Sequence, residues 1–252
     1  AQVGYICVNE ASKTHLGSPE KCQKHGRCGT EMSELLPHLS GIVDDICLIR
    51  SMHTGANGHE VSSRYFHGGI PGVLGRPHMA SWLLYALGCE TENLPAYMVL
   101  TDPGGPPVDS TNNWSSGFMP ALYQGTVLRP REPRILNLNA PEHLRGIPQR
   151  QNLDFLQSIN QQHADQFPGN SELQARIASY ELAAKMQIAA TDALDIQQEP
   201  QYIHELYGLD RDETREYGTR CLIARRLIER GVRFVQLFLN GQPWDNHSNI
   251  ST

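Results

Sequence analysis

The chain has 252 residues, of which 39% are hydrophobic and 19% are charged, and this composition is typical of a globular protein with one or two cores. A formal net charge of −6 argues against a basic surface that binds nucleic acid or anionic membranes. No apolar run reaches the roughly 18 to 20 residues that a membrane-spanning helix needs. The expected partners therefore include no nucleic acid, and no membrane span is expected.

The two ends of the chain suggest truncation. The first residue is Ala1 rather than Met, and the last residues, 249–252, run on directly from a motif-like segment. No signal peptide precedes the first elements. We therefore expect an internal fragment of a longer protein.

The cysteines are too sparse for a disulfide-stapled scaffold, with six in the whole chain. Cys22 and Cys28 are the one close pair, and no second pair at zinc-finger spacing accompanies them. We expect free or buried thiols, with a local disulfide between Cys22 and Cys28 as the alternative.

The first fifty residues predict an irregular segment, then a helix, then a strand. Residues 1–29 show no clear periodicity. Thr30 can cap a helix whose apolar residues continue to Val43, with a break or kink at Pro37. The apolar run at 46–49 is typical of a short strand that is buried on both faces.

The next segment predicts two helices and a strand. After a loop at 51–58, a short helix is expected at 59–67, and a second helix should run from Pro77 to the Gly88 stop. A buried strand follows at 97–100. The loop after it, 101–116, is longer than most loops in compact domains, and loops of that length are commonly functional.

From residue 146 onward the composition favours helices. Three or four are expected up to residue 230, and we expect 146–210 to be a helical excursion that packs on the sheet. The helix at 212–230 leads into a third strand at 234–239. The alternation of strands and helices predicts an α/β fold with a mostly parallel sheet sandwiched by helices.

Polar side chains follow each predicted strand, and the carboxyl ends of parallel strands meet at one edge of a sheet. These side chains are His53, Asn57 and His59 after the first strand, Asp102 and Asp109 after the second, and Asp245 and His247 after the third. We expect this edge to hold the functional site.

Asp245 and His247 are the strongest candidates for metal ligands. Two residues apart in an extended segment, a carboxylate and an imidazole point the same way and can reach one cation. This mixture of ligands is compatible with zinc, manganese or iron. The alternative for this pair is an ordinary loop salt bridge or a turn-capping Asp.

The histidines and arginines of 50–67 are further candidates. His53 and His59 could serve as ligands or acid/base groups, and the expected position of His59 at a helix amino terminus favours an anion. His67 is expected to end that helix. Arg50 and Arg64 could hold an oxyanion, although most exposed arginines form surface ion pairs.

Four segments, taken together, resemble the DUF1501 family, sulfatase-like proteins of the alkaline phosphatase superfamily. They are DDICLIRSMHT at 44–54, GRPHMASWL at 75–83, RRLIERGVRFVQ at 225–236 and WDNH at 244–247. The resemblance extends over nearly the whole chain. It implies an alkaline-phosphatase-like fold, here a single truncated domain over 1–252 that is incomplete at both ends.

The resemblance also implies a two-metal site, in which Asp245 and His247 match the family's Asp-x-His element. Other ligand segments of the family are absent, so this fragment is expected to be inactive alone. Sulfatases and phosphatases of the superfamily place Cys, Ser or Thr where His59 stands here. An exported or periplasmic location is likewise implied by the resemblance.

The leading hypothesis is a metal-dependent hydrolase of sulfate or phosphate esters, acting on a small-molecule or polysaccharide ester with a divalent metal: zinc, manganese or calcium. His59 and His53 would be catalytic, Asp245 and His247 would bind metal, and Asn57 and Arg64 would contact substrate. One alternative is a metal-dependent phosphotransferase or mutase with a covalent intermediate on His59. The other is a non-catalytic exported binding or structural protein on the same fold.

Overall fold

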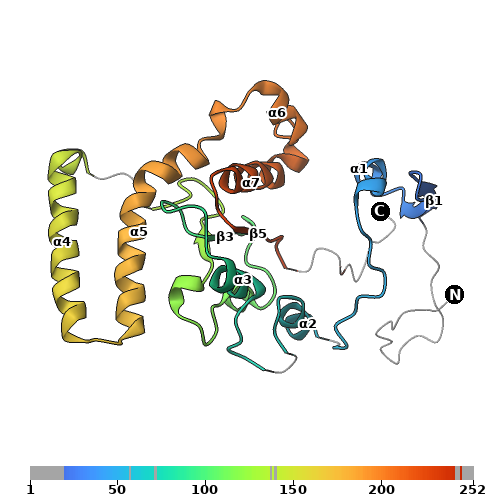
Figure 1. The fold of residues 1–252 in the computed structure, drawn as a ribbon. Coiled ribbons are helices and arrows are strands. Elements are labelled where there is room, and N and C mark those ends of the chain that lie inside the picture. The colour runs from blue at the N-terminus through green and yellow to red at the C-terminus, as the bar shows by residue number, and fades with distance from the viewer. Residues whose placement is uncertain are drawn as a thin grey trace. The chain divides into compact units, whose positions relative to one another are not determined.

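A computed structural model describes residues 20–56, 58–70, 73–136, 138, 141–241 and 245 (Figure 1). The chain divides into two compact units, Gly58–Asp245 and a smaller one that comprises Ala1–Asn57 and Asn246–Thr252. Within the smaller unit the described residues are 20–56. Each unit is described separately below.

The smaller unit contains an antiparallel hairpin, β1 (Cys22–His25) and β2 (Thr30–Ser33), followed by α1 (Pro37–Gly41) and a 3-10 turn, η1 (Val43–Asp45). The Asp44 carboxylate accepts hydrogen bonds from the backbone N–H groups of Arg27 and Cys28, at 2.8 and 2.9 Å. These two donors lower the pKa of Asp44. The carboxylate therefore holds the hairpin turn against η1.

Three predictions for this segment are wrong. Cys22–His25 is a strand rather than irregular, and Thr30–Ser33 pairs with it instead of opening a helix. The helix begins only at Pro37, where a proline is tolerated because the first turn needs no N–H donor. Residues 46–49 form no ladder with any described strand, and Ile49 is 60% exposed. Cys22 and Cys28 are free thiols, as expected.

The larger unit is built on a three-stranded parallel sheet in the order β4-β3-β5. Its strands are β3 (Tyr97–Leu100), β4 (Thr126–Leu128) and β5 (Phe234–Leu237). Val99 at the centre pairs with Val127 on one side and Gln236 on the other. The predicted mixed α/β fold with a parallel sheet is confirmed at this level, and the strand predicted at 97–100 is confirmed residue for residue.

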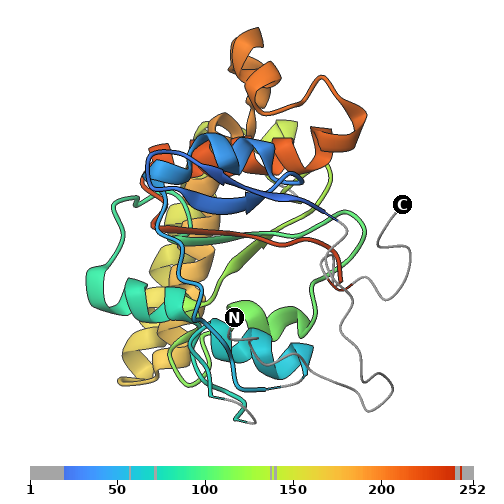
Figure 2. The same cartoon turned by 90° about the vertical axis from the view of Figure 1, so that its right-hand side faces the viewer.

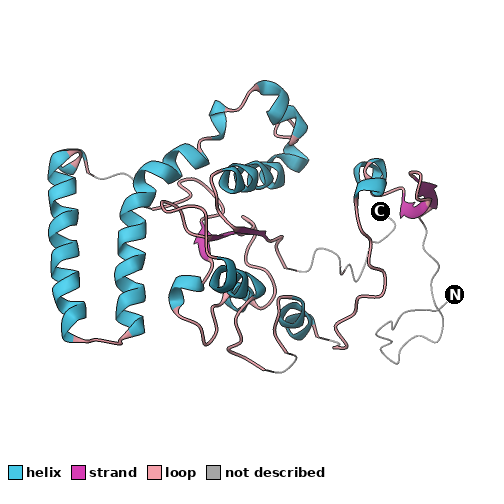
Figure 3. Ribbon diagram, in the orientation of Figure 1, coloured by secondary structure: helices cyan, strands magenta, loops and turns pink. Residues whose placement is uncertain are grey.

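The sheet carries helices on both faces, as Figures 1 and 2 show for α3 on one side and α7 on the other. Figure 3 distinguishes the helices of this unit from its strands by colour. The α-helices of the unit are α2 (His59–Phe66), α3 (Met79–Leu87), α4 (Ile147–Gln166), α5 (Ser171–Leu194), α6 (Gln201–Leu206) and α7 (Asp212–Glu229). The 3-10 turns are η2 (Ser110–Trp114), η3 (Ala121–Tyr123), η4 (Glu142–Leu144) and η5 (Ile196–Gln198).

Local sequence explains where α3 begins and ends. His78 precedes it, and the Nδ1 atom of His78 accepts a hydrogen bond from the backbone N–H of Ala80 at 3.0 Å. Gly88 ends the helix with a φ of 66°, a conformation that glycine adopts without strain. The helices predicted after residue 58 and after Pro77 are both confirmed.

The two faces of β3 alternate, as the period of a strand requires. Met98 and Leu100 pack against α5 and α7, and the core on this side consists of Leu94, Met98, Leu100, Leu128, Met186, Ala190, Ala193, Ile223, Leu227 and Val232. Tyr97 and Val99 face the other way, toward α3 and Trp114 of η2. The long loop that contains Trp114 is therefore packed.

Strand β4 was not predicted. Gly125 stands immediately before it, and a Cβ atom at this position would lie 2.7 Å from Cγ2 of Val99 and 2.9 Å from Cβ of Trp114. Only a glycine allows the chain to approach β3 this closely. The three-residue strand that follows is too short to carry a periodic signal.

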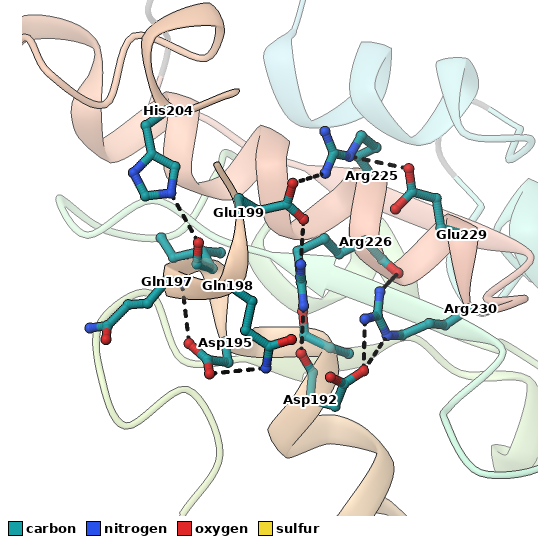
Figure 4. A network of polar contacts seen from close by, with 12 residues as sticks. Asp192, Asp195, Gln197, Gln198, Glu199, His204, Arg225, Arg226, Glu229 and Arg230 are labelled. Atoms are coloured by element: carbon teal, nitrogen blue, oxygen red, sulfur yellow. Dashed lines mark hydrogen bonds and ion pairs between the residues drawn. The ribbon is translucent and has the colours of Figure 1, made fainter. Parts of the chain in front are cut away.

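An ion-pair network joins the end of α5 to α7 (Figure 4). The Arg226 side chain, 5% exposed, donates to the carbonyls of Ala193 and Asp192 at 3.0 and 2.8 Å, and it pairs with Glu199. Glu199 also accepts from Arg225 at 2.6 Å. Because the Arg226 side chain satisfies carbonyls near the C-terminus of α5, the network orients α5 against the core.

Helix α4 lies alongside α5 as the outer member of a helical hairpin (Figure 1). No helix in the described ranges combines the length and the apolar character that crossing a membrane requires.

Candidate functional site

His59 and Asp245 lie in contact. His59 is the first residue of α2, and Asp245 follows β5 on the carboxyl side of that strand. The Nε2 atom of His59 is 2.8 Å from Oδ2 of Asp245, and the two side chains are 50% and 37% exposed. Two residues that are far apart in the sequence are thus brought together in a half-exposed position, open to a ligand.

Arg64, one helical turn and a half further along α2, is held by Asp109. Its Nε and Nη2 atoms donate to the two carboxylate oxygens of Asp109 at 2.5 and 2.8 Å, in the forked arrangement that guanidinium groups favour. The hydrogen bond from Arg64 lowers the pKa of Asp109, so this carboxylate is ionised at neutral pH. The predicted loop after β3 therefore supplies the partner of Arg64.

The Asp109 backbone adopts a left-handed conformation, with a φ of 68°, and Ser110 follows with a φ of 44°. Such conformations are uncommon for residues other than glycine, and they persist where surrounding contacts enforce them. The fork to Arg64 and a 2.9 Å hydrogen bond from Asn112 to Asp109 are contacts of this kind.

A buried polar network lies between α2, α3 and the sheet. His67, at the end of α2 as expected, has its Nε2 atom 3.1 Å from the Gln236 side-chain nitrogen. The same nitrogen is 3.4 Å from Nε2 of His78, and the Gln236 oxygen accepts from the hydroxyl of Tyr97. The His67 and His78 rings are 4.7 Å apart. Three segments thus meet around one glutamine on β5.

The network continues along α2 to the loop after β3. The Ser63 hydroxyl donates to Oδ1 of Asn113 at 2.5 Å, and Nδ1 of His67 lies 3.4 Å from the Ser63 oxygen. Because the Ser63 proton is engaged, His67 donates through Nδ1 and accepts from Gln236 at Nε2. Asn113 in turn donates to the carbonyl of Val108 at 2.6 Å. Each polar side chain in this series of hydrogen bonds therefore has a partner.

Burial sets the protonation of these groups. Desolvation, with a smaller contribution from His67, lowers the pKa of His78 to about 3. Desolvation also lowers the pKa of His67 and raises the pKa of Tyr97. At neutral pH the two imidazoles are neutral and the phenol keeps its proton, so the network contains no net charge.

The other residues considered in the sequence analysis form contacts of their own or belong to the smaller unit. Asp102 pairs with Arg220 at 2.6 Å, and Arg220 also donates to the carbonyl of Phe238, so Arg220 links α7 to the segments that follow β3 and β5. His53 is exposed within the smaller unit. Arg50 donates to the carbonyl of Glu31 at 3.4 Å in that unit. Asn57 and His247 lie outside the described residues.

The metal prediction named Asp245 and His247, and of these two the structure describes Asp245. In the part of the chain that the structure describes, no group of three or more His, Cys, Asp or Glu side chains is arranged to hold a metal ion. Asp245 and His59 nevertheless offer a carboxylate oxygen and an imidazole nitrogen at one place, the donor types that zinc and manganese accept. These two residues fit two positions of a coordination shell.

The functional interest of His78, Tyr97 and Gln236 was missed by the sequence reasoning. Gln236 does carry a signal, because it is the one polar residue in the apolar run at 234–239. A polar side chain that turns inward from a half-buried strand needs a partner, and His67 and Tyr97 are its partners here.

Comparison with known proteins identifies the family alone. No curated protein and no solved structure matches the chain. One family model matches, with the description "Protein of unknown function (DUF1501)", and it covers residues 4–252. Because this match spans nearly the whole chain, the protein belongs to the DUF1501 family.

Proposed function

We propose that this chain contributes to the active site of a metal-dependent hydrolase of sulfate or phosphate esters with an alkaline-phosphatase-like fold. The observation that carries the proposal is the 2.8 Å contact between His59 and Asp245. It joins the start of α2 to the segment after β5, on the side of the sheet where α/β enzymes hold their ligands. The sulfatase-like character rests on the family resemblance of the four sequence segments.

Asp245 and His59 would hold a divalent cation, with zinc, manganese or calcium as candidates and with His247 as a further proposed ligand. When bound, the cation would supply Lewis acidity toward the ester and an activated water. His53 is the proposed acid/base group, and Asn57 and Arg64 are the proposed substrate contacts. The substrate would be a small-molecule or polysaccharide ester, and the protein would act outside the cytoplasm.

The chain's own residues prepare this site in two ways. The Asp245 carboxylate lies against Nε2 of His59, so the two groups that would hold the cation already stand together. The contacts of Ser63, Arg64 and His67 with the loop after β3 and with β5 hold α2 in position. The first residue of α2 is therefore presented by a helix that is fixed along its length.

The test is to measure metal content and ester hydrolysis of the purified full-length protein. Asp245→Asn and His59→Gln should each lower bound metal, and the hydrolysis of 4-nitrophenyl sulfate or phosphate should fall more than about 100-fold. Matched controls are Asp154→Asn and His143→Gln, which change the same residue types at exposed positions of α4 and η4. Equal metal content and equal rates in all five proteins would refute the proposal.

The same experiment separates two rivals. A phosphotransferase that uses His59 as nucleophile would accumulate phosphohistidine, detectable by mass spectrometry and lost in His59→Gln. The contact of the Asp245 carboxylate with Nε2 of His59 favours this rival, because a carboxylate partner activates an imidazole ring as a nucleophile. A non-catalytic protein would hydrolyse neither ester at any metal loading.

A further inference from the structure

A cavity of about 80 Å³ lies beside the carboxyl end of α2, within the larger unit. Residues 73–78, the end of α2 and the η2 region border it. Its polar lining residues are Arg64, His67, Arg76, His78, Asn112 and Ser115. The volume admits a few water molecules or one small ion, and it excludes a sugar or a nucleotide as a whole.

The lining of this cavity is positively charged. Two arginines contribute to it, and no Asp or Glu is found among the described residues that line it. Asp109 contacts Arg64 from outside this lining and neutralises one of the two charges. Arg76 is exposed and forms no ion pair with any described residue. One positive charge therefore remains without a counter-ion among the described residues.

The donors at the cavity are held in place before any ligand arrives. Asp109 engages Nε and Nη2 of Arg64 and leaves the hydrogens of Nη1 for another acceptor. The Asp109 side chain is 5% exposed, so this fork is shielded from water. Asn112 is fixed by its 2.9 Å bond to the same carboxylate. A guanidinium oriented in this way suits a planar or tetrahedral oxyanion better than a mobile lysine would.

The cavity is separate from the proposed catalytic pair. His59 begins α2 and His67 follows its last residue, and eight residues of helix correspond to about 12 Å along the axis. A ligand beside His67 therefore lies about one helix length from His59 and Asp245.

We propose that this cavity is a binding site for a small oxyanion, of the size of inorganic sulfate or phosphate, with Arg64 and Arg76 as its charged contacts. The ligand is either the free inorganic anion or the anionic group of a larger molecule that extends out of the cavity. Arg64 is also a proposed substrate contact of the ester hydrolase, whereas Arg76 belongs to this cavity alone. The test of this inference therefore relies on Arg76 and on protein from which any metal has been removed.

The test is an isothermal calorimetric titration of the metal-free protein with inorganic sulfate and with inorganic phosphate, at constant ionic strength. A chelator removes any cation at Asp245, so an anion bound through a metal does not contribute. The parent protein and Asp245→Asn should bind at least one of the anions equally well. Arg76→Gln should weaken binding about tenfold or more.

Arg131→Gln is the matched control, because Arg131 is also exposed and is not among the lining residues. Arg64→Gln should abolish binding, and pairing it with Asp109→Asn avoids a buried carboxylate without a partner. Failure of both anions to bind would overturn the proposal. So would equal binding by the parent and Arg76→Gln, or an equal loss in Arg131→Gln.

The source of the anion is distinguished by a second titration with 4-nitrophenyl sulfate and 4-nitrophenyl phosphate. If the cavity takes the anionic group of a larger molecule, one of these esters should bind and compete with the inorganic anion. If it takes the free anion, only the inorganic form should bind. In either case Arg76→Gln must weaken the binding for the site to stand.

Discussion

The two faces of the three-stranded sheet differ in what they bury. Toward α5 and α7 the strands present Met98, Leu100 and Leu128, and the partners on the helices are apolar. Toward α2 and α3 they present Tyr97 and Gln236, whose partners are histidines. The first face stabilises the unit by removing apolar surface from water. The second combines the apolar cluster around Val99 and Trp114 with polar groups that are held in fixed positions at some cost in desolvation.

This difference indicates on which face of the sheet a functional site is expected. A buried hydrogen-bonded network adds little net stability compared with an apolar core of similar volume, but it specifies a single arrangement of its members. The face that carries the network also carries α2, with His59 at one end and the arginine-lined cavity at the other. Three substitutions can sharpen or break this contrast.

The largest loss of stability is expected from Leu227→Ala on the apolar face. Leu227 has 0% exposure and packs in the core beside Leu100 and Ile223. Truncation should lower the free energy of unfolding by about 2–5 kcal/mol, measured by urea denaturation. Leu206→Ala, at a position that is 74% exposed, is the control and should change it by less than about 0.5 kcal/mol. A similar loss in both variants would contradict the assignment of this core.

A pH-dependent effect is expected from His78 on the polar face. Its pKa is about 3 in the folded protein and about 6.5 in an unfolded chain. Below pH 6.5 the unfolded chain therefore binds a proton that the folded protein does not, so stability falls as the pH drops from 6.5 toward 3. At pH 5 the loss relative to pH 7 should be about 2 kcal/mol.

His78→Asn tests this expectation, because asparagine can still accept from the backbone N–H of Ala80 and cannot titrate. Between pH 7 and pH 5 the variant should lose less stability than the parent in urea denaturation. His67 and Tyr97, the titratable groups that face His78, remain in both proteins. Identical pH dependence would show that His78 is not buried as described.

The smallest effect is expected from Tyr97→Phe. This substitution removes the hydroxyl that donates to Gln236 and leaves the ring in its packed position. The unfolding free energy should fall by about 1 kcal/mol, because one acceptor of the network loses its donor. A loss as large as that of Leu227→Ala would mean that the polar face contributes to stability as much as the apolar one.

The sequence predicted the elements with strong local signals. The buried strand Tyr97–Leu100, the helix before Gly88 and the helix Asp212–Glu229 all combine apolar runs with clear end signals. Segments whose signals are short or misleading were predicted wrongly. The apolar run at 46–49 has the composition of a strand, but a strand also needs a hydrogen-bonding partner, which composition does not reveal.

The candidate site was predictable in part, for a topological reason. His59 and Asp245 follow predicted strands, so the rule for the carboxyl edge of a parallel sheet brought both into the candidate set. The strand assumed before His59 does not exist, however, and the contact with Asp245 arises from the position of α2. His78 lies at the start of a helix, and Gln236 lies in an apolar strand. Their contact joins residues that are 158 positions apart in the sequence.

The order of the strands has a consequence for how the chain folds. The central strand Tyr97–Leu100 has its partners at Thr126–Leu128 and at Phe234–Leu237, and the whole α4–α5 hairpin lies between these two partners in the sequence. Closing so long a loop costs chain entropy before any pairing energy is gained, and non-local pairing of this kind slows folding. The helical hairpin, whose contacts are local, can form long before the sheet is complete.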